Sequence, residues 1–179
     1  MEKQNKKLAA EEKLEVYWAT IGYINGLNRS SEIKAGLIIS FYGLLLGVVF
    51  QLGTGIDSNL ELNVFLLIVL LIFIFFVSRS IYFSFKCFLP QIETKFDKNM
   101  FFFHDVVTHF GPISRFSGEF MDLLDDEEKL YGQLGEQIYV ISLIASKKFS
   151  DVNNSVRNLV YSFIPLLVCV IAIVIENFL

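Results

Sequence analysis

The longest apolar run of the chain, residues 64–85, limits the possible folds more than any other feature. Its first fourteen residues, Val64 to Val77, contain no polar side chain. At the helical rise, 22 residues make about 33 Å, close to the hydrocarbon thickness of a bilayer. Arg79 lies near the end of the run, where a long side chain can bury its stem and reach the headgroups. A buried helix of a soluble protein rarely stays apolar for so long, so we predict a transmembrane helix.

Two further segments have the length and composition of membrane spans. Residues 35–52 and 159–175 carry no charged side chain and contain 18 and 17 residues. Alone, either segment is also compatible with a re-entrant or buried helix. The chain is 54% hydrophobic with a mean hydropathy of +0.53, which is too apolar for an ordinary soluble domain. We therefore predict an all-α integral membrane protein with three transmembrane helices, at residues 35–52, 64–85 and 159–175.

The distribution of basic residues predicts which parts face the cytoplasm. The sequence has 15 lysines and arginines, and none lies in residues 53–63 or 176–179. Because loops rich in Lys and Arg stay on the cytoplasmic side, we place residues 1–34 and 86–158 in the cytoplasm. The loop 53–63 and the tail 176–179 are then external, so the N-terminus is cytoplasmic and the C-terminus is outside.

Two amphipathic stretches lead into the first and third spans. The apolar stripe of the first stretch is Leu14, Tyr17, Trp18, Ile21, Ile24 and Leu27. The stripe of the second is Leu130, Leu134, Ile138, Ile141, Ala145, Phe149, Val152 and Val156. Three- and four-residue spacings are typical of helices with one apolar face. No strong breaker separates either stretch from its span, so we predict two long rods that pack on each other as a cytoplasmic helical bundle.

The segment between the second span and the last rod is rich in aromatic residues. Phe101, Phe102 and Phe103 are compatible with a core, a membrane-surface anchor or a partner-binding patch. We favour packing of this segment against the bundle or the headgroups. A further helix is expected to begin near Ser117, where acidic residues follow and suit the first turn.

No catalytic motif is found in the sequence. It contains no nucleophile elbow, no P-loop and no dinucleotide-binding glycine pattern. His104, Asp105 and His109 invite a metal interpretation because Asp105 and His109 are four residues apart. Two histidines without further ligands are a weak signal, however. We therefore expect neither an enzyme nor a metal or other cofactor.

Small residues line one side of the first predicted span. Ser40, Gly43 and Gly47 fall on one helical face, and the two glycines form a GxxxG pattern. Such faces let membrane helices approach closely, although the pattern is also common by chance in apolar helices. We interpret this face as an oligomerisation surface and predict a homo-oligomer.

Four basic residues are predicted close to the inner membrane face. Arg29 and Lys34 precede the first span, and Lys147 and Lys148 precede the third. One interpretation is anchoring to anionic headgroups. The other is an anion pocket between the rods, where Arg binds a phosphate bidentately and Lys acts as a point charge. Glu32, one turn from Arg29, would hold the guanidinium in place. Further residues that would line this pocket are Asn25, Asn28, Gln137 and Ser142, with Tyr23 or Tyr139 stacking on a base.

At these residues the sequence resembles a known family. The segment from Ile24 to Gly47 resembles the pattern Arg-x-x-Asp/Glu-x-Lys-Ala that opens the first span of Pycsar-type transmembrane effectors. The segment from Leu134 to Phe149 is similar to a second block of that family, with Ile141 where Asn is usual. The matching residues are Arg29, Glu32, Lys34 and Ala35 in the first block, and Gln137, Ile138, Tyr139, Ser142, Ala145 and Lys148 in the second. The aromatic segment before Val107 is more loosely similar.

The resemblance implies a role in bacterial anti-phage defence. In such systems a cyclase makes cCMP or cUMP upon infection, and a membrane effector responds by impairing the inner membrane, so that the infected cell stops growing or dies. The expected partners are then a cyclic nucleotide, the lipid bilayer and further copies of the chain, with no nucleic acid polymer. The nucleotide-binding residues would be Arg29, Glu32, Lys34, Gln137, Tyr139, Ser142, Lys147 and Lys148. A membrane adaptor and a pore-forming toxin restrained by a partner remain the alternative functions.

Overall fold

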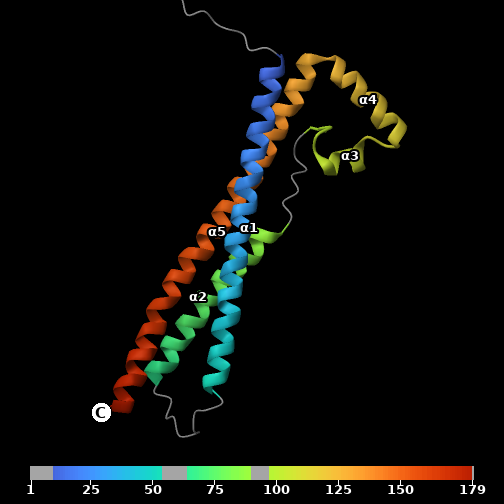
Figure 1. The fold of residues 1–179 in the computed structure, drawn as a ribbon. Coiled ribbons are helices and arrows are strands. Elements are labelled where there is room, and N and C mark those ends of the chain that lie inside the picture. Colours follow the sequence, from blue (N-terminus) through green and yellow to red (C-terminus); the bar gives the residue numbers. More distant parts are fainter. Residues whose placement is uncertain (1–9, 54–63, 90–96, 179) are drawn as a thin grey trace, which may run out of the picture. The chain divides into compact units, whose positions relative to one another are not determined.

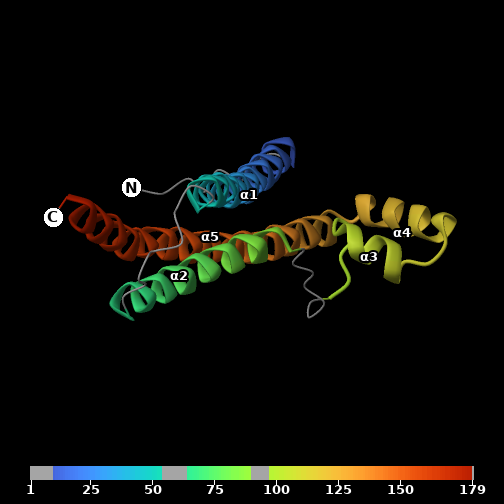
Figure 2. The same cartoon turned by 90° about the horizontal axis from the view of Figure 1, so that it is seen from below.

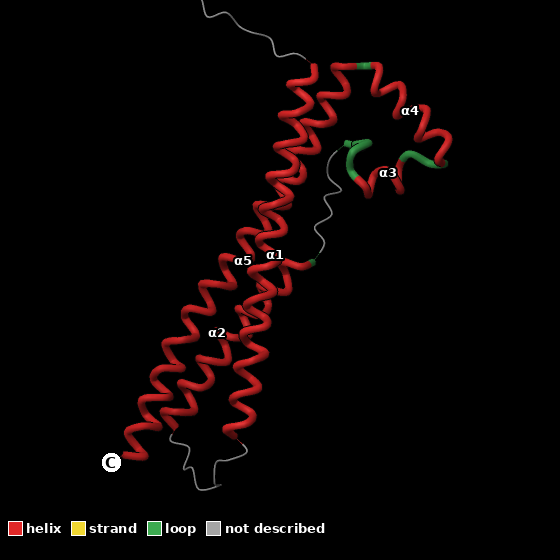
Figure 3. Tube along the Cα trace, in the orientation of Figure 1, coloured by secondary structure: helices red, strands yellow, loops and turns green. Residues whose placement is uncertain are grey.

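The computed structural model contains helices and turns, and no strand, over the residues that it describes, which are 10–53, 64–89 and 97–178. Its helices are α1 (Ala10–Gly53), α2 (Val64–Phe88), α3 (Phe103–His109), α4 (Ile113–Asp125) and α5 (Glu127–Phe178) (Figure 1). Figure 3 shows that only short turns separate the helices within residues 97–178. Most of the predicted external loop, 54–63, lies outside the described residues, as do residues 1–9, 90–96 and 179.

Three of the helices, α1, α2 and α5, are each long and apolar enough to cross a membrane. The predicted all-α fold and its three candidate spans are therefore confirmed, while the limits of the spans and their orientation stay predictions. Helix α1 is unbroken over 44 residues and α5 over 52. Helix α5 continues through Pro165, which a membrane helix tolerates because its neighbours can compensate for the lost hydrogen bond.

The described residues form two compact units, both of which contain part of α1 and part of α5. Residues 1–28 and 90–146 make the first unit, and residues 29–89 and 147–179 make the second. We call the second the membrane unit, because it contains the apolar run of α2. Each unit is described by itself below.

In the first unit, α1 and α5 run parallel and their apolar stripes meet. The Tyr17 and Tyr131 rings stack with centroids 5.7 Å apart, and the Tyr17 hydroxyl donates a hydrogen bond of 3.2 Å to the Tyr131 carbonyl oxygen. One turn earlier, Lys13 pairs with Glu127 at 3.3 Å. Two to three turns later, Ile24, Ile141 and Ala145 form a buried cluster, with Ile21 and Ile138 against it. The sequence predicts that Trp18 and Leu27 also belong to this stripe, but 58% and 39% of their surface is exposed, so they lie outside the contact.

The aromatic segment forms a second core in the same unit. Met100, Phe110 and Leu123 are buried together, and the residues packed around them are Phe101, Phe116, Phe120 and Leu130. Phe102 is also buried, but Phe103 is 71% exposed, so the three consecutive phenylalanines do not share one environment. The segment thus packs mainly between α3, α4 and the start of α5.

The predicted helix start near Ser117 is wrong, because α4 begins four residues earlier at Ile113. Gly111 adopts φ +74°, a conformation that suits glycine, and Pro112 then precedes the first helical turn. The acidic stretch does not continue α4 into α5 either. Asp126 has extended backbone angles between the two helices.

The membrane unit contains α2 packed antiparallel on α5, with α1 beside them. Figures 1 and 2 both show α2 alongside α5. Ala35 of α1, Cys87 of α2 and Val152 of α5 form a cluster in which no member is more than 1% exposed. Small side chains at this point let the three backbones approach closely, which is how helices pack in lipid. Phe149 and Val156 of the predicted stripe lie outside this core, with 49% and 40% of their surface exposed.

Asp126 marks the boundary between α4 and α5 and caps α5. Its Oδ1 accepts a hydrogen bond of 3.1 Å from the Lys129 backbone N–H, and its Oδ2 pairs with the Lys129 ammonium at 2.8 Å. The hydrogen bonds from the Lys129 side chain and backbone hold the pKa of the Asp126 carboxyl below its usual range. The charged carboxylate therefore favours the folded state.

We predict that Asp126→Ala lowers the midpoint of thermal unfolding and that Asp126→Asn, which can still cap the helix, lowers it less. Because the folded pKa lies below the unfolded value, the carboxylate's contribution is complete above the unfolded pKa of about 3.9. It is lost as the pH falls through the folded pKa. Circular dichroism of the detergent-solubilised chain at neutral and acidic pH measures both effects. Equal midpoints for Asp126→Ala and the unsubstituted protein at neutral pH would contradict the capping role.

Candidate functional site

The eight predicted nucleotide-binding residues are divided between the two units. Arg29, Glu32, Lys34, Lys147 and Lys148 belong to the membrane unit, whereas Gln137, Tyr139 and Ser142 belong to the first unit. All eight lie on α1 or α5.

In the membrane unit, Glu32 of α1 pairs with Lys148 of α5. The Lys148 residue is only 9% exposed, while the Glu32 side chain is 40% exposed. The expected pairing of Glu32 with Arg29 is wrong, since the carboxylate contacts a cation on another helix. Lys148 therefore differs from Arg29 and Lys34, because its charge is already compensated inside the protein.

Arg29 and Lys34 lie on either side of Glu32 along α1, and both are exposed. The Lys34 ammonium lies 6.0 Å from the centroid of the Phe149 ring. No ion pair of Arg29 or Lys34 is observed within the described residues. These two cations thus remain available to an external anion, next to an ion pair that joins α1 to α5.

A second ion pair, which the sequence does not predict, joins α2 to α5 in the same unit. The Lys86 ammonium lies 3.0 Å from Oδ1 of Asp151, whose side chain is only 7% exposed. The Cys87 thiol, buried beside it, donates a weak hydrogen bond of 3.7 Å to the Lys148 carbonyl oxygen. Asp151 lies three residues after Lys148, so one face of α5 receives a carboxylate from α1 and a cation from α2. In the sequence, the three-residue spacing of Lys148 and Asp151 indicates that both lie on one face of a helix. It does not show which helices provide their partners.

In the first unit, Tyr139 lines a cavity of about 160 Å³. The other residues around it are Asp97, Asn99, Phe102, Asp105, Glu136 and Val140. Its walls are therefore aromatic and acidic, and none of the predicted cations is among the residues that line it. Gln137 and Ser142 are not among them either. The Gln137 Oε1 is buried without a hydrogen-bond partner, as is the Asn28 Oδ1 in the same unit.

Asn99 lines this cavity and is the centre of a hydrogen-bond network. Its Nδ2 donates hydrogen bonds to the Gln133 carbonyl oxygen at 2.7 Å and to the Glu136 carboxylate at 3.3 Å. Its Oδ1 accepts a hydrogen bond from the Phe101 N–H at 2.8 Å, and its own N–H donates one to Asp105 Oδ2 at 3.0 Å. These hydrogen bonds of Asn99 therefore join the loop before α3 to α5.

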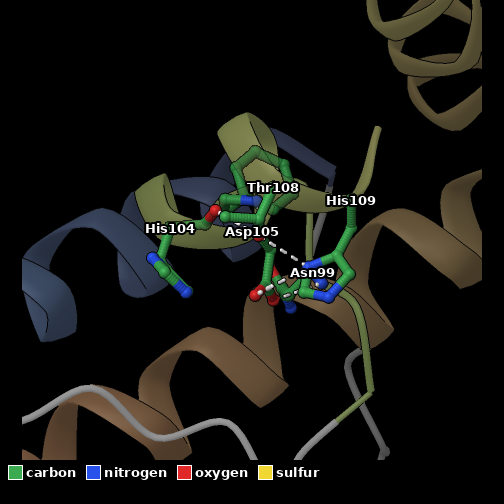
Figure 4. Close-up of polar contacts among 6 residues, drawn as sticks. Asn99, His104, Asp105, Thr108 and His109 are labelled. Carbon is green, nitrogen blue, oxygen red and sulfur yellow. Dashed lines mark hydrogen bonds and ion pairs between the residues drawn. The ribbon is translucent and has the colours of Figure 1, made fainter. Parts of the chain in front are cut away.

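The three residues of the metal interpretation lie on α3, but they do not converge. Asp105 Oδ1 lies 3.5 Å from His109 Nδ1, which also contacts the Thr108 hydroxyl at 2.8 Å. Figure 4 shows His109 and Asn99 turned toward Asp105, whereas the His104 ring points away from them. Among the described residues, no group of three His, Cys, Asp or Glu side chains could hold a metal ion.

The Glu32–Lys148 pair makes a testable contribution to stability. Removing one partner of a fully buried pair costs about 3–5 kcal/mol. Because Glu32 is 40% exposed, we expect Lys148→Met to cost about 1–3 kcal/mol, chiefly by leaving the carboxylate unpaired. Combining it with Glu32→Gln should recover part of this loss. Thermal unfolding in detergent gives the measurement, with the exposed Arg157→Met on the same helix as the control. Strict additivity of the two substitutions would contradict the pairing.

Comparison with known proteins identifies the family. The family model described as "Pycsar effector protein domain" matches residues 16–175, which is nearly the whole chain. No curated protein and no solved structure matches the chain significantly. The match includes α2 and nearly all of the long helices α1 and α5, as well as both blocks that carry the resemblance in the sequence. The chain therefore belongs to the Pycsar effector family, the membrane effectors of anti-phage defence.

Proposed function

We propose that the chain is an inner-membrane effector that a cyclic nucleotide, cUMP or cCMP, activates to impair the membrane of the infected cell. Growth arrest or death of that cell follows. In this role the chain catalyses no reaction and needs no cofactor. Its family membership supports the membrane and defence parts of the proposal. One structural observation supports an anionic ligand: Arg29 and Lys34 are exposed at the start of the apolar part of α1.

The phosphate is the part of the ligand that these cations suit. A guanidinium can bind two phosphate oxygens at once, and an ammonium can add a point charge. One Arg and one Lys suffice for the single charge of a cyclic mononucleotide. We assign the phosphate to Arg29 and Lys34, and not to Lys148, because Glu32 already compensates Lys148. Lys147, Gln137, Tyr139 and Ser142 stay predicted contacts.

The proposed orientation follows from the distribution of lysine and arginine. Arg29, Lys34 and the ion pairs of α5 would face the cytoplasm, where a second messenger made by a cyclase accumulates. Residues 53–63 and 176–179, which contain no Lys or Arg, would face outward. A cytoplasmic position for residues 1–34 and 86–158 is therefore part of the proposal.

Leakage from proteoliposomes tests the ligand proposal. We predict that cUMP or cCMP releases an entrapped dye from vesicles containing the full chain. Arg29→Ala should reduce this release at least tenfold, because a lost bidentate contact to a charged group costs about 1.5–3 kcal/mol. The control is Arg115→Ala on α4, whose guanidinium is exposed and pairs with Glu119 on the same helix.

Three outcomes separate the proposal from its alternatives. Release by neither nucleotide, at any concentration that a cell reaches, favours a membrane adaptor. Release without any nucleotide favours a toxin that a partner restrains. Release that Arg29→Ala and Lys34→Ala both leave unchanged would mean that these cations only anchor the chain to headgroups.

The predicted oligomerisation face is accessible in the single chain. Ser40, Gly43 and Gly47 are all exposed on α1, and a Cβ placed on either glycine meets no atom within 4 Å. A side chain added at either glycine therefore begins in open space within one chain. The open space on this face supports a contact between copies.

We predict that replacing Gly43 and Gly47 together with leucine lowers the oligomeric state in detergent and the toxicity in cells. The fold should be preserved because the added side chains have space within the chain. Light scattering gives the mass, and circular dichroism checks the fold. Val48→Leu, on an exposed neighbouring face of the same helix, is the matched control. An unchanged mass with intact toxicity would exclude this face from the interface.

A further inference from the structure

Within the membrane unit, a line of buried polar side chains follows one face of α5. Its members, separated by three or four residues, are Lys148, Asp151, Ser155, Asn158 and Ser162. Each is at most 9% exposed. Polar groups inside a membrane helix bundle are costly, so their presence calls for a structural or a functional reason.

The part of this line nearest the ion pairs has a structural reason. Ser80 and Ser155 donate hydrogen bonds to each other's carbonyl oxygen, both at 2.8 Å. The Ser84 and Ser155 hydroxyl oxygens are 2.6 Å apart. Because these bonds join α2 to α5, the three serines act as the polar contacts that commonly hold membrane helices together.

The deeper part of the line is different, because its polar groups do not bind another helix. Asn158, 6% exposed, donates from Nδ2 to the Asn154 carbonyl oxygen of its own helix at 2.7 Å. Ser162, 3% exposed, donates to the Leu159 carbonyl oxygen, also at 2.7 Å. Helix–helix adhesion therefore does not explain these two side chains.

Tyr42 of α1 adds a third buried polar group to this region. It is only 2% exposed, and its hydroxyl has no hydrogen-bond partner. The register of the parallel helices is fixed by Glu32 with Lys148 and by Ala35 with Val152. Ten residues after Glu32, Tyr42 is thus at the level of Asn158 to Ser162.

These three groups lie at the depth of the apolar run of α2. The Phe76 ring of α2 is 5.7 Å from the Tyr161 ring of α5, between Asn158 and Ser162 in the sequence. Phe76 belongs to the stretch of α2 that contains no polar side chain. Tyr42 and Ser162 are therefore inside the hydrocarbon region, and Asn158 lies at its cytoplasmic end. We call these three residues the intramembrane polar seam.

We propose that the intramembrane polar seam lines a pathway for water and small monovalent ions when α1 moves away from the α2–α5 pair. This inference rests on the proposed function and specifies its mechanism: the membrane is impaired by a conducting path and not by disordered lipid. Hydroxyl and amide groups can replace part of an ion's hydration shell. The hydroxyl of Tyr42, which lacks a partner in the closed packing, gains a hydrogen bond to water on opening.

The distribution of contacts indicates that α1 is the helix that moves. Helices α2 and α5 are joined by the serine contacts and by the Lys86–Asp151 pair. In the membrane unit, α1 is held to α5 by the Glu32–Lys148 ion pair at one end. Deeper in the unit, α1 and α5 meet through apolar contacts such as the Phe41 and Phe163 rings, 5.9 Å apart, which lipid replaces at little cost.

Thiol accessibility tests the pathway. In a background with Cys87→Ala and Cys169→Ala, Ser162→Cys introduces a nearly isosteric thiol into the seam. Leu167→Cys, 60% exposed on another part of α5, is the lipid-facing control. We expect a membrane-impermeant, positively charged methanethiosulfonate to modify Ser162→Cys only in the presence of cUMP or cCMP, and to reduce potassium flux from proteoliposomes several-fold. The background itself and Leu167→Cys should show neither effect.

Charge selectivity gives a second readout that a purely structural role would not change. Asn158→Asp should shift the reversal potential in planar bilayers toward that of potassium, and Asn158→Lys should shift it toward that of chloride. Nucleotide-induced flux that neither thiol modification nor these charges alter would overturn the pathway and leave the proposed function intact. Absence of flux with both nucleotides, in the unsubstituted protein, would overturn both.

Discussion

The membrane unit depends on one face of α5, because α1 and α2 both attach to it. From Lys148 to Ser155 this face receives the Glu32 carboxylate of α1, the Lys86 ammonium of α2 and the hydroxyls of Ser80 and Ser84. In lipid there is little hydrophobic force between helices, since the acyl chains are as apolar as the side chains. Hydrogen bonds, ion pairs and close approach of small residues must therefore set which helices associate and in what register.

The arrangement of charge on this face has a further consequence. Lys148 and Asp151 are close together in the sequence, but each is compensated by a residue of a different helix. A buried pair contributes little net stability compared with apolar packing, yet breaking it is expensive. Such pairs specify geometry more than they add stability. Here they fix α1 and α2 against the same turns of α5, at the boundary where the apolar part of α1 begins.

Much of the fold follows from the sequence, because long apolar runs and helical periodicity are local properties. The three candidate spans and the contact of the Ile24 and Ile141 stripes are of this kind. The pairing of Glu32 with Lys148 is not a local property. The i,i+3 rule points to Arg29, and only the packing of α1 on α5 brings Lys148 to Glu32. The serine contacts cannot be predicted from local sequence patterns either, because Ser80 and Ser155 are 75 residues apart. Gly111 and Pro112 indicate where α4 begins. The acidic residues after Ser117 indicate the helix start less well than that turn does.

The position of the cations suggests how an anion could act on the polar seam. Arg29 and Lys34 lie within a turn of Glu32, whose carboxylate holds Lys148 and so keeps one end of α1 on α5. In the proposed function, a phosphate bound by these cations would bring a negative charge close to Glu32. Its repulsion of the Glu32 carboxylate would weaken the pair with Lys148 that keeps α1 in place. A ligand shifts such an equilibrium only through its different affinity for the two states. Moving it from 1:99 to 99:1 requires about a 10⁴-fold difference in affinity. Relief of the repulsion between the phosphate and Glu32 when α1 moves would supply part of that difference.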